Sequence, residues 1–324
     1  MAAARARHAL AKAGLDPDVE LTPMSSVTNE VWVAGDYVVR VNRHPVARLW
    51  REATLASLLP ADVGCPEVIS YGGIIGADWM ITRRIEGEIL ARCWHTMNVE
   101  QRRSAVAQIA DRLRLLHGWV CPETLPELDS PQLLQGDCDR GATEPLLDAL
   151  DLVQDLEHVD PVMVVAAKAI VREAAPALEP LDTRTFVHGD LHFENLLWDG
   201  ERITALLDFE WSRPAPPDLE LDVFLRFCAY PFLHVAADYE HLVKTSDYAD
   251  VPWWMAEEYG ELFAHEHQLE RVRTYSIAYD VRDLLLHPPD RPVDQLSQFH
   301  PYHRLAELVA GTSHLDRFAA TAAA

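Results

Sequence analysis

Short apolar runs separated by turn residues dominate the start of the chain and predict a small antiparallel sheet. Residues 31–33 and 37–41 are rich in valine and flank Ala-Gly-Asp, a sequence typical of a hairpin turn. Residues 79–82 form another short apolar strand, and residues 47–59 have a helical pattern that ends before a proline. The first residues alternate alanine with basic side chains, which indicates an amphipathic helix and not a secretory leader.

Helical periodicity replaces this strand pattern in the remainder of the chain. Apolar residues at helical spacing predict helices in four segments: 106–116, 146–156, 253–286 and 302–318. Residues 184–211 are the exception, since three short apolar runs there predict strands. The pattern therefore indicates an α+β chain with a strand-rich part of about 85 residues and a larger helical part.

Composition and charge exclude several classes of protein. Of 324 residues, 49% are hydrophobic and 24% are charged, and no apolar stretch reaches the roughly 18 residues of a membrane span. The 51 acidic and 28 basic residues give a net charge of −23, which argues against binding to nucleic acid. Five cysteines without CxxC spacing indicate a reducing cytoplasm. We expect a cytoplasmic protein that binds neither membranes nor nucleic acid, with an acidic surface that serves solvation or attracts a cationic partner.

The pattern His-x-Asp-x-x-x-x-Asn lies in the strand-forming central segment. It consists of His188, Asp190 and Asn195, and two apolar strands follow it with Asp199-Gly200 between them. That dipeptide predicts a two-residue hairpin turn, from which the returning strand carries Asp208 back toward the motif. We therefore expect Asp190, Asn195 and Asp208 to converge on one spot.

Such a cluster suits phosphoryl transfer. Two carboxylates and an amide oxygen are hard ligands of the kind that Mg²⁺ prefers, and Mg²⁺ completes its shell with water and phosphate oxygens. Phosphoryl transfer also needs a carboxylate that orients the attacking hydroxyl. Asp190 precedes Asn195 by five residues, and Asp208 precedes a phenylalanine, as in the corresponding motifs of protein kinases. The alternative is a network of polar caps around tight turns.

Upstream residues agree with a nucleotide site. Arg40 lies on the strand where kinases usually have lysine, and Glu52 in the next helix can pair with it. No GxGxxG motif precedes Arg40, and a polar stretch takes its place. Its candidate phosphate contacts are Ser25, Ser26 and Thr28. An ordinary polar turn is the more common explanation of such a stretch.

Together these motifs resemble the aminoglycoside phosphotransferase family, small-molecule kinases with a protein-kinase-like fold. The resemblance covers about residues 20–230 and is strongest over 186–222. Residues 217–222, Pro-Asp-Leu-Glu-Leu-Asp, resemble the family's GDPxxDL segment with proline for glycine and leucine for proline. The resemblance implies a two-lobed α+β fold, with a small antiparallel-sheet N-lobe over 1–85 and a larger helical C-lobe over 86–324.

The resemblance also implies roles for the site residues. Asp190 would be the catalytic base, Asn195 and Asp208 would bind magnesium, and Arg40 with Glu52 would serve the ATP phosphates, although the motifs do not separate ATP from GTP. The base of the nucleotide would lie against the connection after the last strand of the sheet: Thr82, Arg83 and Arg84.

These motifs do not identify the acceptor. Acidic and aromatic residues suit a cationic acceptor, and the candidates are Glu210, Trp254, Glu257, Glu258, Tyr275, Tyr279 and Asp283. Tyr275, Tyr279 and Asp283 recur every four residues, so one helix face can present them together. For each single residue, a core aromatic or a solvated acid is the more common explanation.

We therefore expect an ATP- and Mg²⁺-dependent kinase that phosphorylates a hydroxyl of an aminoglycoside-like or other cationic small molecule, which would be an antibiotic-resistance activity. One alternative is a metabolic kinase for a sugar, an amino alcohol or a homoserine-like substrate. The other is a non-catalytic, kinase-like nucleotide-binding protein. The presence of Asp190, Asn195 and Asp208 favours an enzyme over that protein. The oligomeric state is not predicted.

Overall fold

The structure, a computed structural model, describes residues 2–24, 26, 29–121, 125–128, 130, 132–136, 139–316 and 318. The chain forms two compact units. The first consists of residues 1–129, 186–213 and 227–258, and the second of residues 130–185, 214–226 and 259–324. The predicted lobe boundary at residue 85 divides the chain differently and stays a prediction.

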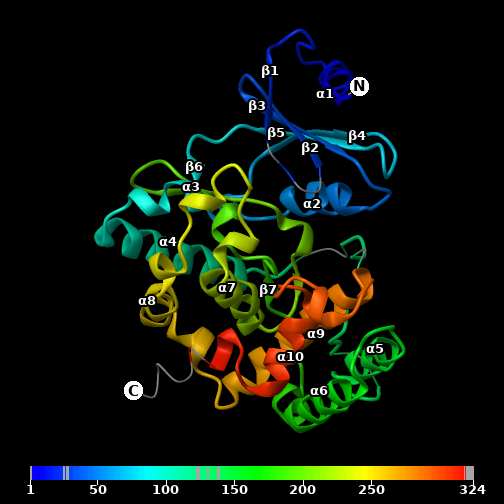
Figure 1. Cartoon of the computed structure of the whole chain (residues 1–324). Coiled ribbons are helices and arrows are strands. Elements are labelled where there is room, and N and C mark those ends of the chain that lie inside the picture. Colours follow the sequence, from blue (N-terminus) through cyan, green and yellow to red (C-terminus); the bar gives the residue numbers. More distant parts are fainter. Residues whose placement is uncertain are drawn as a thin grey trace. The chain divides into compact units, whose positions relative to one another are not determined.

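Five antiparallel strands form the main sheet of the first unit, in the order β1-β2-β3-β5-β4 (Figure 1). The strands are β1 (Leu21–Met24), β2 (Asn29–Ala34), β3 (Tyr37–Asn42), β4 (Val68–Gly72) and β5 (Trp79–Arg83). β2 and β3 meet at the pair Ala34 and Tyr37, and Gly35 in the turn has a φ of 60°. The predicted hairpin and the predicted strand at 79–82 are therefore confirmed.

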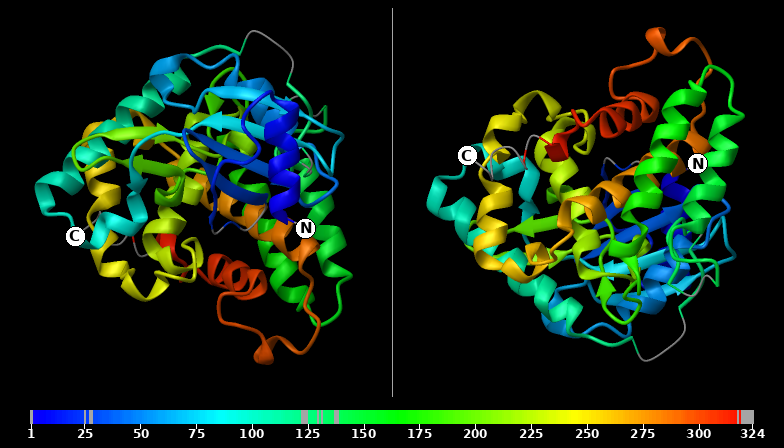
Figure 2. Two further views of the ribbon diagram at one scale, coloured as in Figure 1. Left: turned by 90° about the horizontal axis from the view of Figure 1, so that it is seen from above. Right: turned by 90° about the horizontal axis from the view of Figure 1, so that it is seen from below.

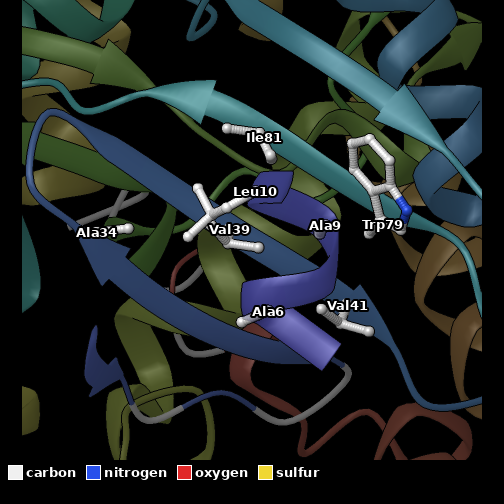
Figure 3. Packing of buried hydrophobic residues seen from close by; sticks show 8 residues of the cluster. All are labelled: Ala6, Ala9, Leu10, Ala34, Val39, Val41, Trp79 and Ile81. Carbon is white, nitrogen blue, oxygen red and sulfur yellow. The ribbon is translucent and has the colours of Figure 1, made fainter. Parts of the chain in front are cut away.

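Helices cover both faces of this sheet. On one face, α1 (Ala2–Lys12) packs its small and branched residues against the strands (Figure 3): Ala6, Ala9 and Leu10 against Val39, Val41, Trp79 and Ile81. Successive side chains of a strand point to opposite faces, so Arg40 belongs to the other face. Its cross-strand partner Met80 packs there against Leu49 and Ala53 of α2 (Arg48–Ala56). The sheet therefore presents Arg40 to α2, the helix predicted over 47–59.

A three-stranded sheet, β6-β8-β9, follows the motif of His188, Asp190 and Asn195 in the first unit, since β8 begins directly after Asn195. Its strands are β6 (Glu88–Ile89), β8 (Leu196–Trp198) and β9 (Ile203–Leu206). The predicted two-residue turn at Asp199-Gly200 is wrong, because β8 and β9 are joined by the four residues 199–202. The Asp199 carboxylate accepts hydrogen bonds from the backbone N–H groups of Glu201 (2.9 Å) and Arg202 (2.7 Å), which stabilises the longer turn.

The first unit also contains short β7 (Phe186–Val187), α3 (Leu90–Cys93), α4 (Val99–His117) and α8 (Val251–Glu258). A capping box of Asn98 and Gln101 starts α4, and α8 packs along it. Two elements, β10 (Arg213–Pro214) and α7 (Glu220–Ala229), continue from one unit into the other. Among the described residues, no helix combines the length and the apolar character that a membrane span needs.

The second unit is helical. It consists of α5 (Glu144–Gln154), α6 (Pro161–Ala174), α9 (Gln268–Leu286) and α10 (Pro301–Ala310), with the first part of α7. α9 lies at its centre and contacts α5, α6 and α10, and the green α5 and α6 lie beside the orange α9 in Figure 2. Helix α5 was predicted. Helix α6 was missed, although Asp160 caps it and Pro161 opens it, as helix starts often do.

Two predicted helices are shorter than their patterns indicated. The single helix predicted over 253–286 is wrong, because residues 259–267 separate α8 from α9. Residues 264–267 are exposed and have no apolar face that could hold them against the core. The helix predicted over 302–318 ends at Ala310, because Gly311 takes a left-handed φ of 68° and caps it.

A buried charge network joins the helices of the second unit. Arg226 on α7 donates to Asp280 (3.1 Å) and to Asp222 (3.4 Å), and Arg304 on α10 also donates to Asp280 (2.7 Å). Arg226 is only 2% exposed and Asp280 is fully buried. Asp283 extends the network, because it accepts from Arg304 (3.0 Å). Each of these buried charges has a partner of the opposite sign, as burial requires.

Candidate active site

His188 fixes the loop that carries Asp190. The fully buried His188 ring accepts a hydrogen bond at Nδ1 from the backbone N–H of Asp190 (3.3 Å), so Nε2 carries the proton and donates to the carbonyl of Leu207 (2.8 Å). Gly189 has a φ of 77°, and a Cβ at this position would lie 2.7 Å from the carbonyl oxygen of Trp211. The loop therefore approaches the segment after β9 too closely for any side chain at position 189.

Asn195 joins the two parts of the predicted cluster. Its Nδ2 donates to the backbone carbonyl of Asp190 (2.9 Å) and lies 3.4 Å from Asp190 Oδ2 and 3.3 Å from His192 Nε2. The Asn195 carbonyl accepts from the N–H of Leu207 (2.8 Å), the residue before Asp208. The structure thus ties the Asp190 loop to the strand end that carries Asp208, despite the longer turn between β8 and β9.

Arg40 connects Asp208 to α2. Its Nη1 donates to both carboxylate oxygens of Glu52 (2.6 and 2.7 Å), and its Nη2 donates to Asp208 Oδ1 (3.0 Å). Burial alone would lower the pKa of the Arg40 guanidinium, but Glu52, Asp208 and Glu210 raise it above its ordinary value. Arg40 therefore stays charged, and the predicted pairing of Arg40 with Glu52 is present. Asp208 has a φ of 64° and a ψ of 59°, a strained conformation for a residue other than glycine.

Asp190 is held in its ionised form. Burial alone would raise its pKa, but the pairing with His192 is the main effect that lowers it, and the pKa lies below its ordinary value. His192 Nε2 lies 3.5 Å from Asp190 Oδ2. Burial lowers the pKa of His192 while Asp190 raises it, and the net shift is upward. An ionised Asp190 can accept a hydrogen bond from a hydroxyl, which is what a carboxylate must do to orient an acceptor.

Glu210, one of the predicted acceptor contacts, faces α2. It is 3% exposed, and its Oε1 accepts from Nη1 of Arg48 (3.0 Å). The Arg48 guanidinium also lies over the ring of Trp211, 4.6 Å from its centroid. Burial and the charge of Asp208 raise the pKa of Glu210 to about 8, although Arg48 and Arg40 lower it. A role of Glu210 at the acceptor stays a prediction.

The residues present fit a magnesium ion. Within the described part of the chain, Asn195 Oδ1 accepts no hydrogen bond, and the Asp208 side chain is 30% exposed. Amide and carboxylate oxygens are the ligands that Mg²⁺ prefers. The described residues contain no group of three or more His, Cys, Asp or Glu side chains arranged to hold a metal. A metal held by Asn195 and Asp208 would therefore take its remaining ligands from water and phosphate.

The other predicted nucleotide contacts have different surroundings. Ser25 and Thr28 lie outside the described residues, and Ser26 is partly buried. The remaining three candidates lie on or after β5. Thr82 pairs with Val38 in the sheet, Arg83 Nε donates to Glu67 at the surface (3.0 Å), and the backbone N–H of Arg84 donates to Asp36 (2.8 Å). Their roles in nucleotide binding stay predictions.

The acceptor candidates on α8 contact α4. The guanidinium of Arg103 on α4 lies 5.7 Å from the ring centroid of Trp254 and pairs with the Glu257 carboxylate. The backbone carbonyl of Glu258 accepts from Arg114, also on α4. These contacts give the three α8 candidates a structural role in holding the two helices together.

The acceptor candidates on α9 have partners within the second unit. The Tyr275 hydroxyl donates to Asp218 (3.1 Å), and the guanidiniums of Arg226 and Arg282 lie 4.4 and 4.3 Å from the ring centroid of Tyr279. Asp283 belongs to the buried charge network. Burial strongly raises the pKa of Tyr275. An acceptor role for these three residues stays a prediction, and the structure gives each of them a structural partner.

Two arginines of α2 belong to the site and were missed by sequence reasoning. Arg48 contacts Glu210 and Trp211, and Arg51 donates to the backbone carbonyl of Ser212. Arg51 is only 4% exposed. Their spacing could have indicated them, because Arg51 and Glu52 follow Arg48 by three and four residues and therefore share one helix face with it.

Comparison with known proteins identifies the class. The family model described as "Phosphotransferase enzyme family" (APH) matches residues 20–254, most of the chain, so the chain belongs to that family. It is therefore a small-molecule phosphotransferase, as the sequence motifs predicted. No protein of curated function matches the sequence.

Solved structures share the fold. A thermostable mutant of the aminoglycoside phosphotransferase APH(4)-Ia, in a ternary complex with ADP and hygromycin B, is 16% identical with a TM-score of 0.62 over 96% of this chain and 97% of that one. ADP-bound aminoglycoside phosphotransferase APH(2'')-Ib is 16% identical, with a TM-score of 0.63 over 96% of this chain and 99% of that one. A choline/ethanolamine kinase family protein from Mesorhizobium loti is 21% identical, with a TM-score of 0.61 over 98% of each chain. The predicted kinase-like α+β fold is confirmed.

Proposed function

We propose that this chain is an ATP- and Mg²⁺-dependent kinase that transfers a phosphoryl group to a hydroxyl of a small cationic molecule. The observation that carries the proposal is the hydrogen-bonded cluster in which Asn195 links Asp190 to the strand end at Asp208. The ion pairs of Arg40 with Glu52 and Asp208 support it, because they place a permanent cation beside the cluster. A kinase of this kind would work in the cytoplasm, where ATP is available, and four cysteines of the described part of the chain are free thiols, which fits that location.

Each residue of the cluster has a step that its chemistry suits. Asp190 accepts a hydrogen bond from the acceptor hydroxyl, aligns its oxygen with the γ-phosphorus and takes its proton as the new P–O bond forms and the bond to ADP breaks. Arg40 binds phosphate oxygens with a guanidinium that cannot lose its proton. Asn195 Oδ1 and Asp208 would hold Mg²⁺, which when bound neutralises charge on the phosphates.

An aminoglycoside-like acceptor fits the charge of the chain. The net charge of −23 favours the approach of a polycation, and two of the solved structures of similar fold are aminoglycoside phosphotransferases. Within this proposal, residues 1–85 form the N-lobe and residues 86–324 the C-lobe with the acceptor site. Such a protein would confer antibiotic resistance.

A metabolic amino alcohol kinase is the second candidate. The structural similarity to a choline/ethanolamine kinase family protein, at 21% identity, favours it. An amino alcohol is also a cation, so the charge of the chain does not separate the two candidates. A protein that only binds nucleotide is disfavoured, because Asp190, Asn195 and Asp208 are all present and tied together.

The test is transfer to a panel of acceptors. Purified protein is incubated with ATP and Mg²⁺ against aminoglycosides, macrolides, amino alcohols, sugars and homoserine, and products heavier by one phosphate are sought by mass spectrometry. A product from an aminoglycoside supports the first candidate, and one from an amino alcohol, a sugar or homoserine supports the metabolic kinase. The product must vanish when EDTA removes the metal. Nucleotide binding without any product, across the whole panel, would contradict the proposed activity on these classes.

A further inference from the structure

One face of α2 contacts alternate residues of the segment that follows β9. Arg48, Arg51 and Glu52 share that face because they are spaced three and four residues apart. They meet the segment at positions 208, 210 and 212, on either side of and within a single 3-10 turn that residues 209–211 form. We call residues 208–212 the Asp208 segment.

The contacts are specific at each of the three positions. Arg48 Nη1 donates to Glu210 Oε1 (3.0 Å), Arg51 Nη2 donates to the carbonyl of Ser212, and Glu52 reaches Asp208 through Arg40. Arg48 also covers the ring of Trp211. Three residues of the segment, Glu210, Trp211 and Ser212, therefore contact α2 directly. Asp208 is connected to α2 through Arg40.

We infer that α2 is a positioning element for Asp208, with Arg48 and Arg51 as positioning residues that act through Glu210 and Ser212. The inference rests on the proposed function in one respect, the role of Asp208 as a metal ligand. It assigns Glu210 to the support of Asp208 and not to the acceptor. The buried carboxylate and its Arg48 partner carry that assignment.

Asp208 needs such support because of its backbone. A left-handed φ of 64° persists in a residue other than glycine only where the surroundings fix it. Before Asp208, the chain is held by the hydrogen bonds of Leu207 with His188 and Asn195. After Asp208, it is held by the contacts of Glu210 and Ser212 with α2, so removal of those contacts weakens the support on one side of the strained residue.

The support reaches the catalytic loop as well. Ser212 Oγ donates to the carbonyl of His188 (3.0 Å), and the same serine accepts from Arg51 at its own carbonyl. Since His188 fixes the N–H of Asp190, a chain of contacts runs from α2 through Ser212 to the loop of the catalytic base. The loop of Asp190 and the segment of Asp208 are therefore both linked to α2 by hydrogen bonds.

The test compares Arg48→Met with wild type by two measurements. Methionine keeps apolar bulk over Trp211 but cannot donate to Glu210. Hydrogen exchange is expected to rise about 10-fold at the amides of residues 209–212, with α4 and α9 unchanged. The Mg²⁺ concentration that gives half-maximal ADP binding in calorimetry is expected to rise about 10-fold, the scale on which residues behind a metal ligand act. Metal-free ADP binding is expected to stay within about 2-fold.

Two further variants separate positioning from bulk structure. Glu210→Gln keeps an oxygen that can accept from Arg48 and is expected to stay close to wild type, whereas Glu210→Ala is expected to reproduce Arg48→Met. Arg291→Met removes an exposed arginine that pairs with Asp290 and is the matched control for loss of an ion pair. If Arg48→Met does not fold, the comparison of Glu210→Ala with Glu210→Gln carries the test.

Wild-type exchange and an unchanged Mg²⁺ requirement in Arg48→Met and Glu210→Ala would overturn the inference. Equal effects of Glu210→Gln and Glu210→Ala on exchange and on the Mg²⁺ requirement would also overturn it. They would mean that the negative charge of Glu210, and not its hydrogen bond with Arg48, is what matters. Absence of any nucleotide binding by the wild type would contradict the proposed function instead. In that case the exchange measurement alone decides whether α2 holds the Asp208 segment.

Discussion

At the scale of single residues, the protonation state of each charged group in the site depends on its burial and on the charged groups beside it. The pairing of His192 with Asp190 lowers the pKa of that carboxyl, and the carboxylates of Glu52 and Asp208 raise the pKa of the Arg40 guanidinium. Glu210 differs, because burial outweighs its arginine partners. The Asp190 carboxyl therefore has a lowered pKa and the Glu210 carboxyl a raised one.

The pH dependence of stability tests the state of Glu210. Its pKa is raised from 4.5 to about 8, so the folded chain holds this proton where the unfolded chain has lost it. The free energy of unfolding should therefore fall as the pH rises from about 5 to 8, by about 1 kcal/mol per pH unit from this group. Glu210→Gln removes that loss. We expect the melting temperature of Glu210→Gln, relative to wild type, to increase steadily over this range.

Thermal denaturation at pH 5, 6, 7 and 8 measures the difference. A difference that stays flat across the series would contradict the raised pKa, and one that decreases with pH would mean that Arg48 stabilises the ionised form more than burial opposes it.

The contact between Asp190 and Asn195 could be predicted because both residues lie in one short motif. Asp190 and Asn195 are five residues apart, and this spacing was sufficient to predict their contact. Arg48 and Glu210 are separated by 162 residues, and nothing in either neighbourhood says that the two side chains meet. Only the packing of α2 on the Asp208 segment brings them together.

At the scale of elements, close contacts between loops make single glycines critical. Gly189 and Gly14 have nearly equal φ values of 77° and 75°, but a Cβ at Gly14 would have no neighbour within 4 Å. Gly14→Ala is therefore the matched control for the cost of the left-handed backbone alone, about 1 kcal/mol. Gly189→Ala adds a clash with the carbonyl of Trp211, and we expect a total loss of about 3 kcal/mol. Urea denaturation compares the two, and equal losses would exclude the clash.

The buried charge network of the second unit gives a further prediction. Arg226→Met leaves Asp280 and Asp222 buried with fewer positive partners, and we expect a loss of about 3–5 kcal/mol. Arg140→Met removes an exposed arginine that pairs with Asp148 and should have a much smaller effect, because solvent screens the pair. Thermal denaturation of the two variants measures the contrast, and a loss for Arg226→Met as small as that for Arg140→Met would show that the network contributes little.

Elements were predicted well where a local signal fixed both ends. The β2–β3 hairpin has a glycine in its turn, and α2 precedes a proline. The β8–β9 turn was wrong because the Asp199 side chain selects a longer loop than its Asp-Gly sequence indicates. Helices α8 and α9 were merged because apolar periodicity on both sides was extended over residues 264–267, which have no apolar face and are exposed.

At the scale of the whole molecule, membership of the phosphotransferase enzyme family and the kinase-like fold agree with the motifs. The acceptor is where sequence reasoning was least informative. The predicted residues on α8 and α9 share the acidic and aromatic character of a cationic site, but their contacts are those of helix packing. Composition cannot separate the two roles, because both place aromatics beside charges.

Asp190→Asn gives the most direct test of the central claim, that the cluster of Asp190, Asn195 and Asp208 transfers phosphate. The measurement is product formation from ATP with the acceptor found in the panel, together with ADP affinity by calorimetry. Asparagine keeps the size of the side chain but cannot take the hydroxyl proton. We expect turnover to fall by about 10³-fold while ADP affinity stays within about 3-fold. Turnover near that of the wild type would contradict the account.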